Sequence, residues 1–153
     1  PQVMKGDLNR PQETADSLRE GWFRTGDVGY MDEDGHFFLV DRLKDLILCS
    51  GYNVYPRMVE EAIYLHPAVA EVTVIGIDDD YRGQSPKAFV KLKEGEKITE
   101  DEMKTFLADK LSKIEMPSQI EFRLELPKTI IGKLSKKELV AEEVEKHKGS
   151  STS

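Results

Sequence analysis

The sequence predicts an α+β fold in which helices flank a short antiparallel or mixed sheet. Apolar residues recur at helical spacing in residues 56–66 and 99–114, whereas residues 69–77 and 87–92 form short apolar runs that are typical of strands. These segments alternate along 153 residues, a length that by itself suggests one domain of ordinary size.

Residues 1–41 predict a short helix followed by a β-hairpin. The helix is expected near residues 11–18. The hairpin is expected from a strand at residues 22–24, a turn at residues 32–35 and a second strand at residues 36–40. An isolated hairpin is only marginally stable in water, so this segment should complete a sheet that the chain does not supply.

A second helix is predicted from Pro56 to about His66. Proline suits the first turn of a helix, because an N–H at that position has no partner within the helix, and Pro67 stops the same segment. The residues on its apolar face are Val59, Ala62, Ile63 and His66.

Strands and further helices complete the pattern. Residues 46–49 add a short apolar run, and residues 78–83 form a polar loop between two strands. Thr99 and Glu102 match a capping box, which predicts the start of the helix that runs to residue 114. Residues 120–124 alternate as a strand, and a last helix begins near Ser135.

The composition excludes several classes of function. The chain carries 22 Lys and Arg against 29 Asp and Glu, a net charge of −7, whereas a general nucleic-acid or anionic-membrane binder needs a basic surface. The single Cys49 excludes an internal disulfide framework and a multi-cysteine zinc site, and it leads us to expect a reducing, cytoplasmic setting. The three histidines share no ligand spacing, so no metal site is predicted. No apolar run reaches the roughly 18 residues of a membrane span.

The acidic excess lies in the first 41 residues. They hold 4 basic and 9 acidic side chains, whereas the remainder holds 18 and 20. This step predicts a domain boundary between Asp41 and Arg42, with one segment at residues 1–41 and a second at residues 42–147. Residues 148–153 are rich in Gly, Ser and Thr and are predicted to form a disordered tail.

Three segments carry a recognisable pattern. They are residues 22–27 (WFRTGD), 41–56 (DRLKDLILCSGYNVYP) and 126–133 (LPKTIIGK), and residues 1–14 fit the same pattern. Their order and spacing resemble the last core motifs of the adenylate-forming (ANL) enzyme superfamily, in particular the AMP-forming fatty acyl-CoA synthetases. The resemblance covers the chain up to about residue 143.

The resemblance implies a fragment of a larger ligase. Residues 1–41 would end the large N-terminal adenylation domain as a hairpin remnant, and residues 42–147 would be the complete small mobile C-terminal domain. The absence of an initiator methionine before Pro1 fits a fragment. The remainder of the N-terminal domain would be its partner, and the fragment alone is not expected to be active.

The implied reaction has two halves. A carboxylic acid, by resemblance a fatty acid, reacts with ATP to give acyl-AMP and pyrophosphate, and the thiol of coenzyme A then displaces AMP. Mg²⁺ would accompany ATP, with its ligands outside this chain.

Matching positions imply roles for single residues in adenylation. The carboxylate of Asp27 could accept hydrogen bonds from both ribose hydroxyls, and the planar guanidinium of Arg42 suits ribose and phosphate oxygens. Lys133 matches the catalytic lysine, whose charge would stabilise negative charge that develops during adenylation. Lys44 matches the hinge about which the small domain rotates.

Other positions match the coenzyme A side of the family. Ser50, Gly51 and Tyr52 match a loop that lines the pantetheine tunnel, and Arg82 matches a position that meets the nucleotide phosphates of coenzyme A in some relatives. The family pattern is broken at Met58, at Glu115 with Met116, and at Ile131, which leaves the subfamily open.

Other functions remain open from the sequence. Gly132 and Lys133 do not form a triphosphate loop, because Leu134 follows the lysine where that motif needs Ser or Thr. One alternative is an adenylation domain that passes the acyl group to a carrier protein. Another is a non-catalytic interaction module that docks a partner through its acidic hairpin. Such a module should be well folded alone, whereas a piece of an enzyme should expose an apolar face in residues 1–41.

Overall fold

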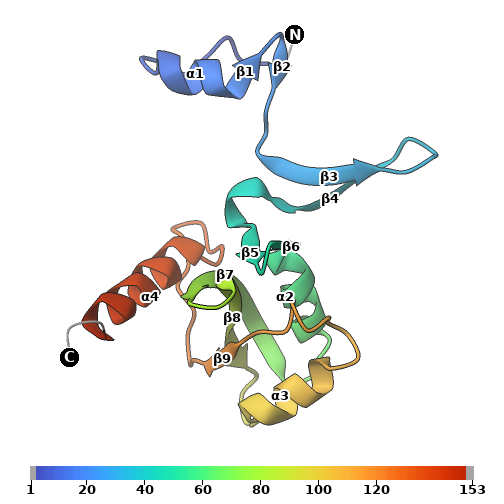
Figure 1. The fold of residues 1–153 in the computed structure, drawn as a ribbon, viewed down its shortest axis with the longest axis vertical. Helices are drawn as coiled ribbons and strands as arrows, with labels where there is room; N and C mark the ends of the chain where they lie inside the picture. Colours follow the sequence, from blue (N-terminus) through green and yellow to red (C-terminus); the bar gives the residue numbers. More distant parts are fainter. Residues whose placement is uncertain (1–2, 151–153) are drawn as a thin grey trace. The chain divides into compact units, whose positions relative to one another are not determined.

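The computed structural model describes residues 3–150 and divides the chain into two units, Pro1–Lys44 and Asp45–Ser153 (Figure 1). Among the described residues, four α-helices and mainly antiparallel strands confirm the predicted α+β class. The sequence-based boundary after Asp41 stays a prediction.

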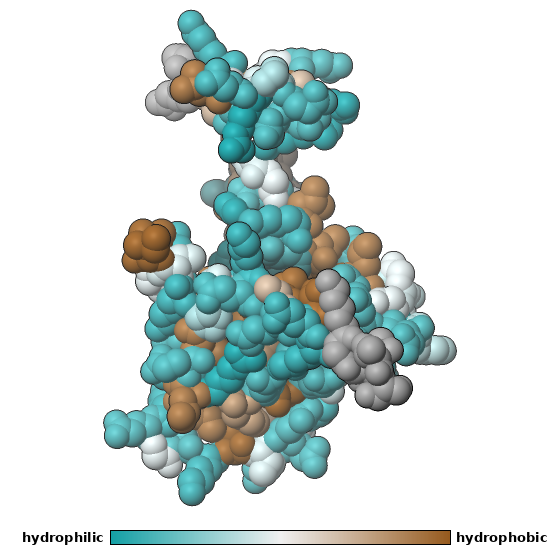
Figure 2. Space-filling model, turned by 90° about the vertical axis from the view of Figure 1, so that its left-hand side faces the viewer, coloured by the Kyte–Doolittle hydropathy of each residue, from teal (hydrophilic) through white to brown (hydrophobic). Residues whose placement is uncertain are grey.

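The first unit contains one short helix and two small antiparallel sheets. Its elements are α1 (Pro11–Ser17), β1 (Leu18–Arg19), β2 (Trp22–Phe23), β3 (Asp27–Met31) and β4 (Phe37–Arg42). Strand β1 pairs with β2, and β3 pairs with β4 around a bulge between Val28 and Gly29. No residue between 3 and 44 is buried, and Trp22, Phe37 and Leu39 are exposed. Figure 2 draws apolar residues in brown, and brown atoms reach the surface on the face that it shows.

The predicted pairing of the first hairpin is wrong. Residues 22–24 were expected to pair with residues 36–40, but β2 pairs with β1, and β3 is the partner of β4. Glu20 and Gly21, with φ of 52° and 83°, form a two-residue turn of the kind that closes tight hairpins, so β1 and β2 close on each other. Gly26, with φ of 77°, then turns the chain before β3.

The second unit contains the remaining elements. After the 3₁₀ turn η1 (Leu43–Asp45), which spans the division, they are β5 (Ile47–Cys49), β6 (Tyr52–Val54), α2 (Pro56–Tyr64), β7 (Val69–Asp79), β8 (Gly83–Leu92), α3 (Glu100–Leu107), β9 (Gln119–Phe122) and α4 (Lys136–Ser150). Helix α4 therefore enters the segment predicted as a disordered tail, and residues 151–153 of that tail lie outside the described residues.

Strand β8 is the centre of a five-stranded sheet. It pairs along its length with β7 in antiparallel register, from Val69 opposite Leu92 to Asp79 opposite Gly83. On its other edge it meets β5 at one pair, Cys49 opposite Gly83, and it then runs parallel to β9. The two central strands are longer than the sequence predicts, so the connection between them is a tight turn.

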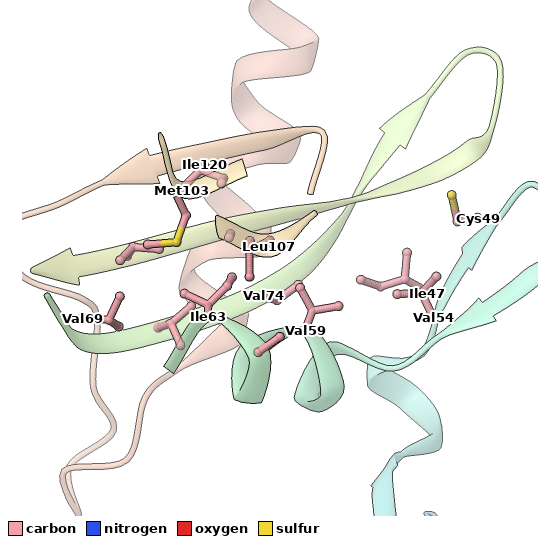
Figure 3. Packing of buried hydrophobic residues seen from close by; sticks show 14 residues of the cluster. Ile47, Cys49, Val54, Val59, Ile63, Val69, Val74, Met103, Leu107 and Ile120 are labelled. Carbon is pink, nitrogen blue, oxygen red and sulfur yellow. The ribbon is translucent and has the colours of Figure 1, made fainter. Parts of the chain in front are cut away.

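Helices cover both faces of this sheet (Figure 1). Val72 and Val74 of β7 face one way and pack in a cluster with α2 and α3, which Figure 3 shows from close by. Ile75 of β7 faces the other way, into a second cluster that includes Leu139 of α4. The alternation follows from the two-residue repeat of a strand, and it explains why β7 and β8 read as continuous apolar runs.

The structure confirms the predicted start of α3 but not its predicted length. Thr99 and Glu102 form the predicted capping box of α3. This helix ends at Leu107, whereas the sequence predicts that it continues to residue 114. Beyond the end of the helix, Ser112 and Glu115 form reciprocal side-chain to backbone hydrogen bonds of their own, which begin a separate turn.

A buried ion cluster joins α4 to the sheet. Lys87 Nζ lies 2.8 Å from Glu143 Oε2 of α4 and 3.0 Å from Glu121 Oε2 of β9, and the Lys87 side chain is only 5% exposed. Arg123 Nε approaches Oε1 of the same Glu121 at 2.7 Å, and Lys146 Nζ lies 2.7 Å from Glu143 Oε1. Because a buried charge without a partner is costly, each of these side chains depends on the others.

The core predicts a clear contrast between two leucines. Leu107 is 0% exposed and Leu124 is 92% exposed. We expect Leu107→Ala to lower the free energy of unfolding by about 2–5 kcal/mol, because it removes packed apolar volume from the core. Leu124→Ala, the matched control, should change it by less than about 0.5 kcal/mol. Urea unfolding followed by circular dichroism measures both, and equal losses would contradict this account of the core.

The ion cluster predicts a loss of stability in acid. Burial alone raises the pKa of Glu121, but hydrogen bonds from Lys87 and Arg123 outweigh it and lower the pKa from its ordinary 4.5 to about 2. The stability that depends on this carboxylate is present above about pH 4.5 and is lost as the pH falls toward about 2.

Urea unfolding at a series of pH values tests this prediction. Over this range Glu121→Gln should show a shallower fall in stability than the wild type. Glu145→Gln, a change at an exposed position of α4, should keep the wild-type slope. A Glu121→Gln slope equal to that of the wild type would show that the cluster does not govern acid stability.

Candidate functional site

Asp27 and Arg42 lie opposite each other on β3 and β4. Arg42 Nε is 3.4 Å from Asp27 Oδ1, and the side chain of Asp27 remains 28% exposed. The Asp27 N–H donates to Thr25 Oγ1 at 3.1 Å, which fixes the backbone at the start of the strand. The structure thus brings together two residues that the sequence predicts to bind one nucleotide.

A small groove lies beside this pair within the first unit. It has a volume of about 290 Å³ and is lined by Thr25, Gly26, Arg42, Leu43 and Lys44. The N–H of Leu43 donates to the carbonyl of Gly26 at 2.8 Å, which closes one side. The partly exposed carboxylate can accept hydrogen bonds from hydroxyls, and the guanidinium can donate to phosphate oxygens. Together these two groups beside the groove suit a nucleotide.

Ser50 and Gly51 form the two-residue turn between β5 and β6. Their φ values are 52° and 80°, the left-handed pair that a tight hairpin of this type requires. Tyr52 follows the turn, opposite Cys49, and its ring is largely exposed. The predicted coenzyme A loop is therefore a tight hairpin end that presents backbone and one aromatic ring to solvent.

Arg82 lies in the turn that joins β7 and β8. Its carbonyl accepts the N–H of Ser50 at 2.7 Å, so the structure brings together the two segments that the sequence predicts to meet coenzyme A. The carboxylate of Asp79 accepts the N–H groups of Tyr81 at 3.0 Å and Arg82 at 2.9 Å. The bond from the Arg82 N–H is the main reason that the pKa of Asp79 lies below its ordinary value.

Lys133 lies on a separate loop of the second unit, after β9. The loop closes through Thr129, whose N–H donates to the Lys133 carbonyl at 2.7 Å and whose Oγ1 accepts the Lys133 N–H at 3.2 Å. Gly132, with φ of 79°, supplies the left-handed residue that this turn needs. The Lys133 side chain is exposed, and no acidic side chain among residues 3–150 pairs with it, so its ammonium can meet a ligand.

Sequence reasoning missed Asp79 and Thr129, because both act through hydrogen bonds to backbone. The prediction of a polar loop over residues 78–83 does not include the two N–H groups that bind the Asp79 carboxylate. The signal that could have found Asp79 is an aspartate shortly before a glycine of positive φ, Gly83, in a position to accept N–H groups two and three residues further on.

A second acidic turn contains a histidine. Asp32, Asp34 and His36 place ligand atoms within 4.8 Å of one another in the β3–β4 turn. Asp32 Oδ1 already accepts the N–H groups of Asp34 at 3.0 Å and His36 at 2.8 Å. These bonds account for the shape of the turn, and we assign no metal to it.

Across the part of the chain that the structure describes, no helix has the length and apolar character that a membrane crossing requires.

Comparison with known proteins gives consistent matches. Residues 58–133 match the family described as the AMP-binding enzyme C-terminal domain. Over 147 residues the chain is 52% identical to a long-chain-fatty-acid–CoA ligase of Bacillus subtilis (strain 168), a match that covers 96% of this chain and 26% of that protein. Over 139 residues it is 48% identical to a 2-succinylbenzoate–CoA ligase of Geobacillus sp. (strain WCH70), covering 91% of this chain and 28% of that protein.

A solved structure of a further CoA ligase also matches this chain. The o-succinylbenzoate CoA synthetase of Bacillus subtilis, in complex with an acyl-adenylate intermediate, matches with a TM-score of 0.84 and 35% identity. That match covers 90% of this chain and 28% of the other. The chain thus spans about a quarter of the length of the curated relatives it matches.

Proposed function

The chain carries the AMP-binding enzyme C-terminal domain and is homologous to acyl-CoA ligases of the ANL superfamily, and from this premise we propose that it is the C-terminal part of a fatty acid–CoA ligase. That enzyme would activate a fatty acid with ATP to acyl-AMP and transfer the acyl group to coenzyme A. The observation that carries the proposal is the pairing of Asp27 with Arg42 beside a groove that suits a nucleotide.

The first unit is proposed to complete a larger domain. No residue between 3 and 44 is buried, and several aromatic side chains of β2 and β4 are exposed. A self-contained interaction module would bury such side chains in a core of its own, so this exposure favours an enzyme piece. We assign residues 1–41 to the end of the N-terminal adenylation domain and residues 42–147 to the mobile C-terminal domain.

Three side chains are proposed to serve adenylation. The Asp27 carboxylate would hold the ribose hydroxyls, and Arg42 would hold both that carboxylate and a phosphate oxygen. Lys133 would bring a positive charge to the oxygens on which negative charge develops during adenylation. Its ammonium pairs with no acidic side chain among residues 3–150, which supports this role. ATP would supply the adenylyl group that activates the acid, with pyrophosphate as the leaving group, and Mg²⁺ would be held by residues outside this chain.

The C-terminal domain would rotate about Lys44 between the two halves of the reaction. This residue lies in the 3₁₀ turn at which the chain passes from one unit to the other. A hinge needs a short element-terminal segment that can absorb a change in φ and ψ, and this turn provides one.

The acceptor is proposed to be coenzyme A. Ser50, Gly51 and Tyr52 form an exposed hairpin end in which the Ser50 N–H donates to the Arg82 carbonyl. Backbone groups, an aromatic residue and an arginine therefore belong to two neighbouring turns. This set suits a long amide-containing arm that ends in phosphates. A carrier protein is the alternative acceptor.

The acyl substrate and the acceptor are tested together in the ligase that contains this chain. Fatty acids of rising chain length and 2-succinylbenzoate are supplied with ATP and coenzyme A, and the thioester is measured by mass spectrometry. We expect thioester from long-chain fatty acids. Thioester from 2-succinylbenzoate alone would overturn the fatty-acid assignment, and no thioester with any acid would favour a carrier protein.

Replacing Lys133 should separate the two half-reactions. In the same ligase, Lys133→Ala should slow adenylate formation by about 100-fold or more, because it removes the charge aimed at the developing anion. Thioester formation from supplied acyl-adenylate should change far less. Pyrophosphate release and thioester formation are the two measurements.

The control for this prediction is Lys137→Ala. It removes the same charge from a nearby exposed position and should leave both rates close to those of the wild type. Equal losses in the two half-reactions of Lys133→Ala would rule out a specific role for Lys133 in adenylation.

A further inference from the structure

The turn between β7 and β8 is held by one carboxylate. Asp79 Oδ1 accepts two successive N–H groups, from Tyr81 at 3.0 Å and from Arg82 at 2.9 Å. Two N–H groups on one carboxylate oxygen fix the backbone direction of the residues that carry them. The path of the chain through Arg82 therefore depends on Asp79.

The same turn supports the β5–β6 hairpin. The Arg82 carbonyl, turned by this arrangement, accepts the Ser50 N–H at 2.7 Å. Strand β5 meets β8 at the residue pair Cys49 and Gly83. Gln84 adds a side-chain bond, in which its Oε1 accepts the Leu48 N–H at 3.0 Å.

The hydrogen-bonded attachment is therefore short, and its bond nearest to the hairpin end is the one to the Arg82 carbonyl. A change in the turn would move the acceptor of Ser50 without disturbing the long β7–β8 ladder or the apolar clusters on the two faces of the sheet. Local displacement of the hairpin end, and not general unfolding, is the expected result.

We propose that Asp79 is a positioning residue for the thioester-forming half-reaction, which acts by fixing the Arg82 turn and, through it, the Ser50–Gly51 end of the β5–β6 hairpin. This inference rests on the proposed use of coenzyme A. Asp79 touches no reacting atom. It acts through two backbone N–H groups, and its effect should appear where the hairpin end and Arg82 meet the acceptor.

Three variants test the role of Asp79 in the ligase that contains this chain. Asp79→Ala removes the acceptor, and we expect the KM for coenzyme A to rise roughly tenfold, as for the loss of hydrogen bonds to a charged group. The rate of adenylation should stay within about twofold, since Asp79 lies outside the adenylation residues.

Asp79→Asn keeps an oxygen at the same position that can accept both N–H groups, so it should restore most of the wild-type KM. Asp80→Ala is the matched control. It removes one acidic group from the same turn at an exposed residue, and the KM for coenzyme A should stay at the wild-type value.

Amide hydrogen exchange on the 153-residue chain gives an independent measurement. The Ser50 amide should exchange faster in Asp79→Ala than in the wild type or Asp79→Asn, whereas amides within the β7–β8 ladder should keep their protection.

The outcomes separate this inference from the proposed function. A wild-type ligase that forms no coenzyme A thioester overturns the proposed function and this role with it, before any variant is compared. With an active wild type, an unchanged KM in Asp79→Ala overturns the inference alone. The same holds for equal losses in both half-reactions, for an equal effect of Asp80→Ala, or for unchanged exchange at Ser50.

Discussion

The pairing of β7 with β8 is the constraint on which the second unit depends. Ten aligned residue positions, from Val69 opposite Leu92 to Asp79 opposite Gly83, set which side chains face α2 and α3 and which face α4. The same register places the β7–β8 turn beside Cys49, so the short hairpin of β5 and β6 can join the sheet edge. A shift by one residue would exchange the two faces and leave Lys87 on the side away from Glu143.

Local signals predicted elements well where a single residue type decides the backbone. Pro56 begins α2, and Thr99 with Glu102 begins α3, because these side chains satisfy or remove N–H groups that a helix leaves free. The end of α3 was not predictable from its apolar pattern, since Leu111 and Ile114 still pack against the core after the helix has stopped. Periodicity reports which residues are buried, and it does not require an unbroken helix.

Pairing between distant segments was the weaker part of the prediction. Residues 22–24 were predicted to pair with residues 36–40. Instead, Glu20 and Gly21 adopt positive φ and form the turn of a nearer hairpin between β1 and β2. In the candidate site, motif residues were named from the sequence, whereas their mutual contacts were not. The bond between Ser50 and Arg82 crosses 32 positions of the chain, and nothing in either segment alone indicates it.

The left-handed turn at Ser50 and Gly51 restricts which residues can occupy these two positions. Neither side chain is needed for the bond that ties this turn to Arg82, because the donor is a backbone N–H. What the position requires is a residue that tolerates positive φ, which restricts replacement mainly to Gly, Asn and Asp. At this turn, selection would therefore act on the backbone conformation, and the chemical identity of the side chain is secondary.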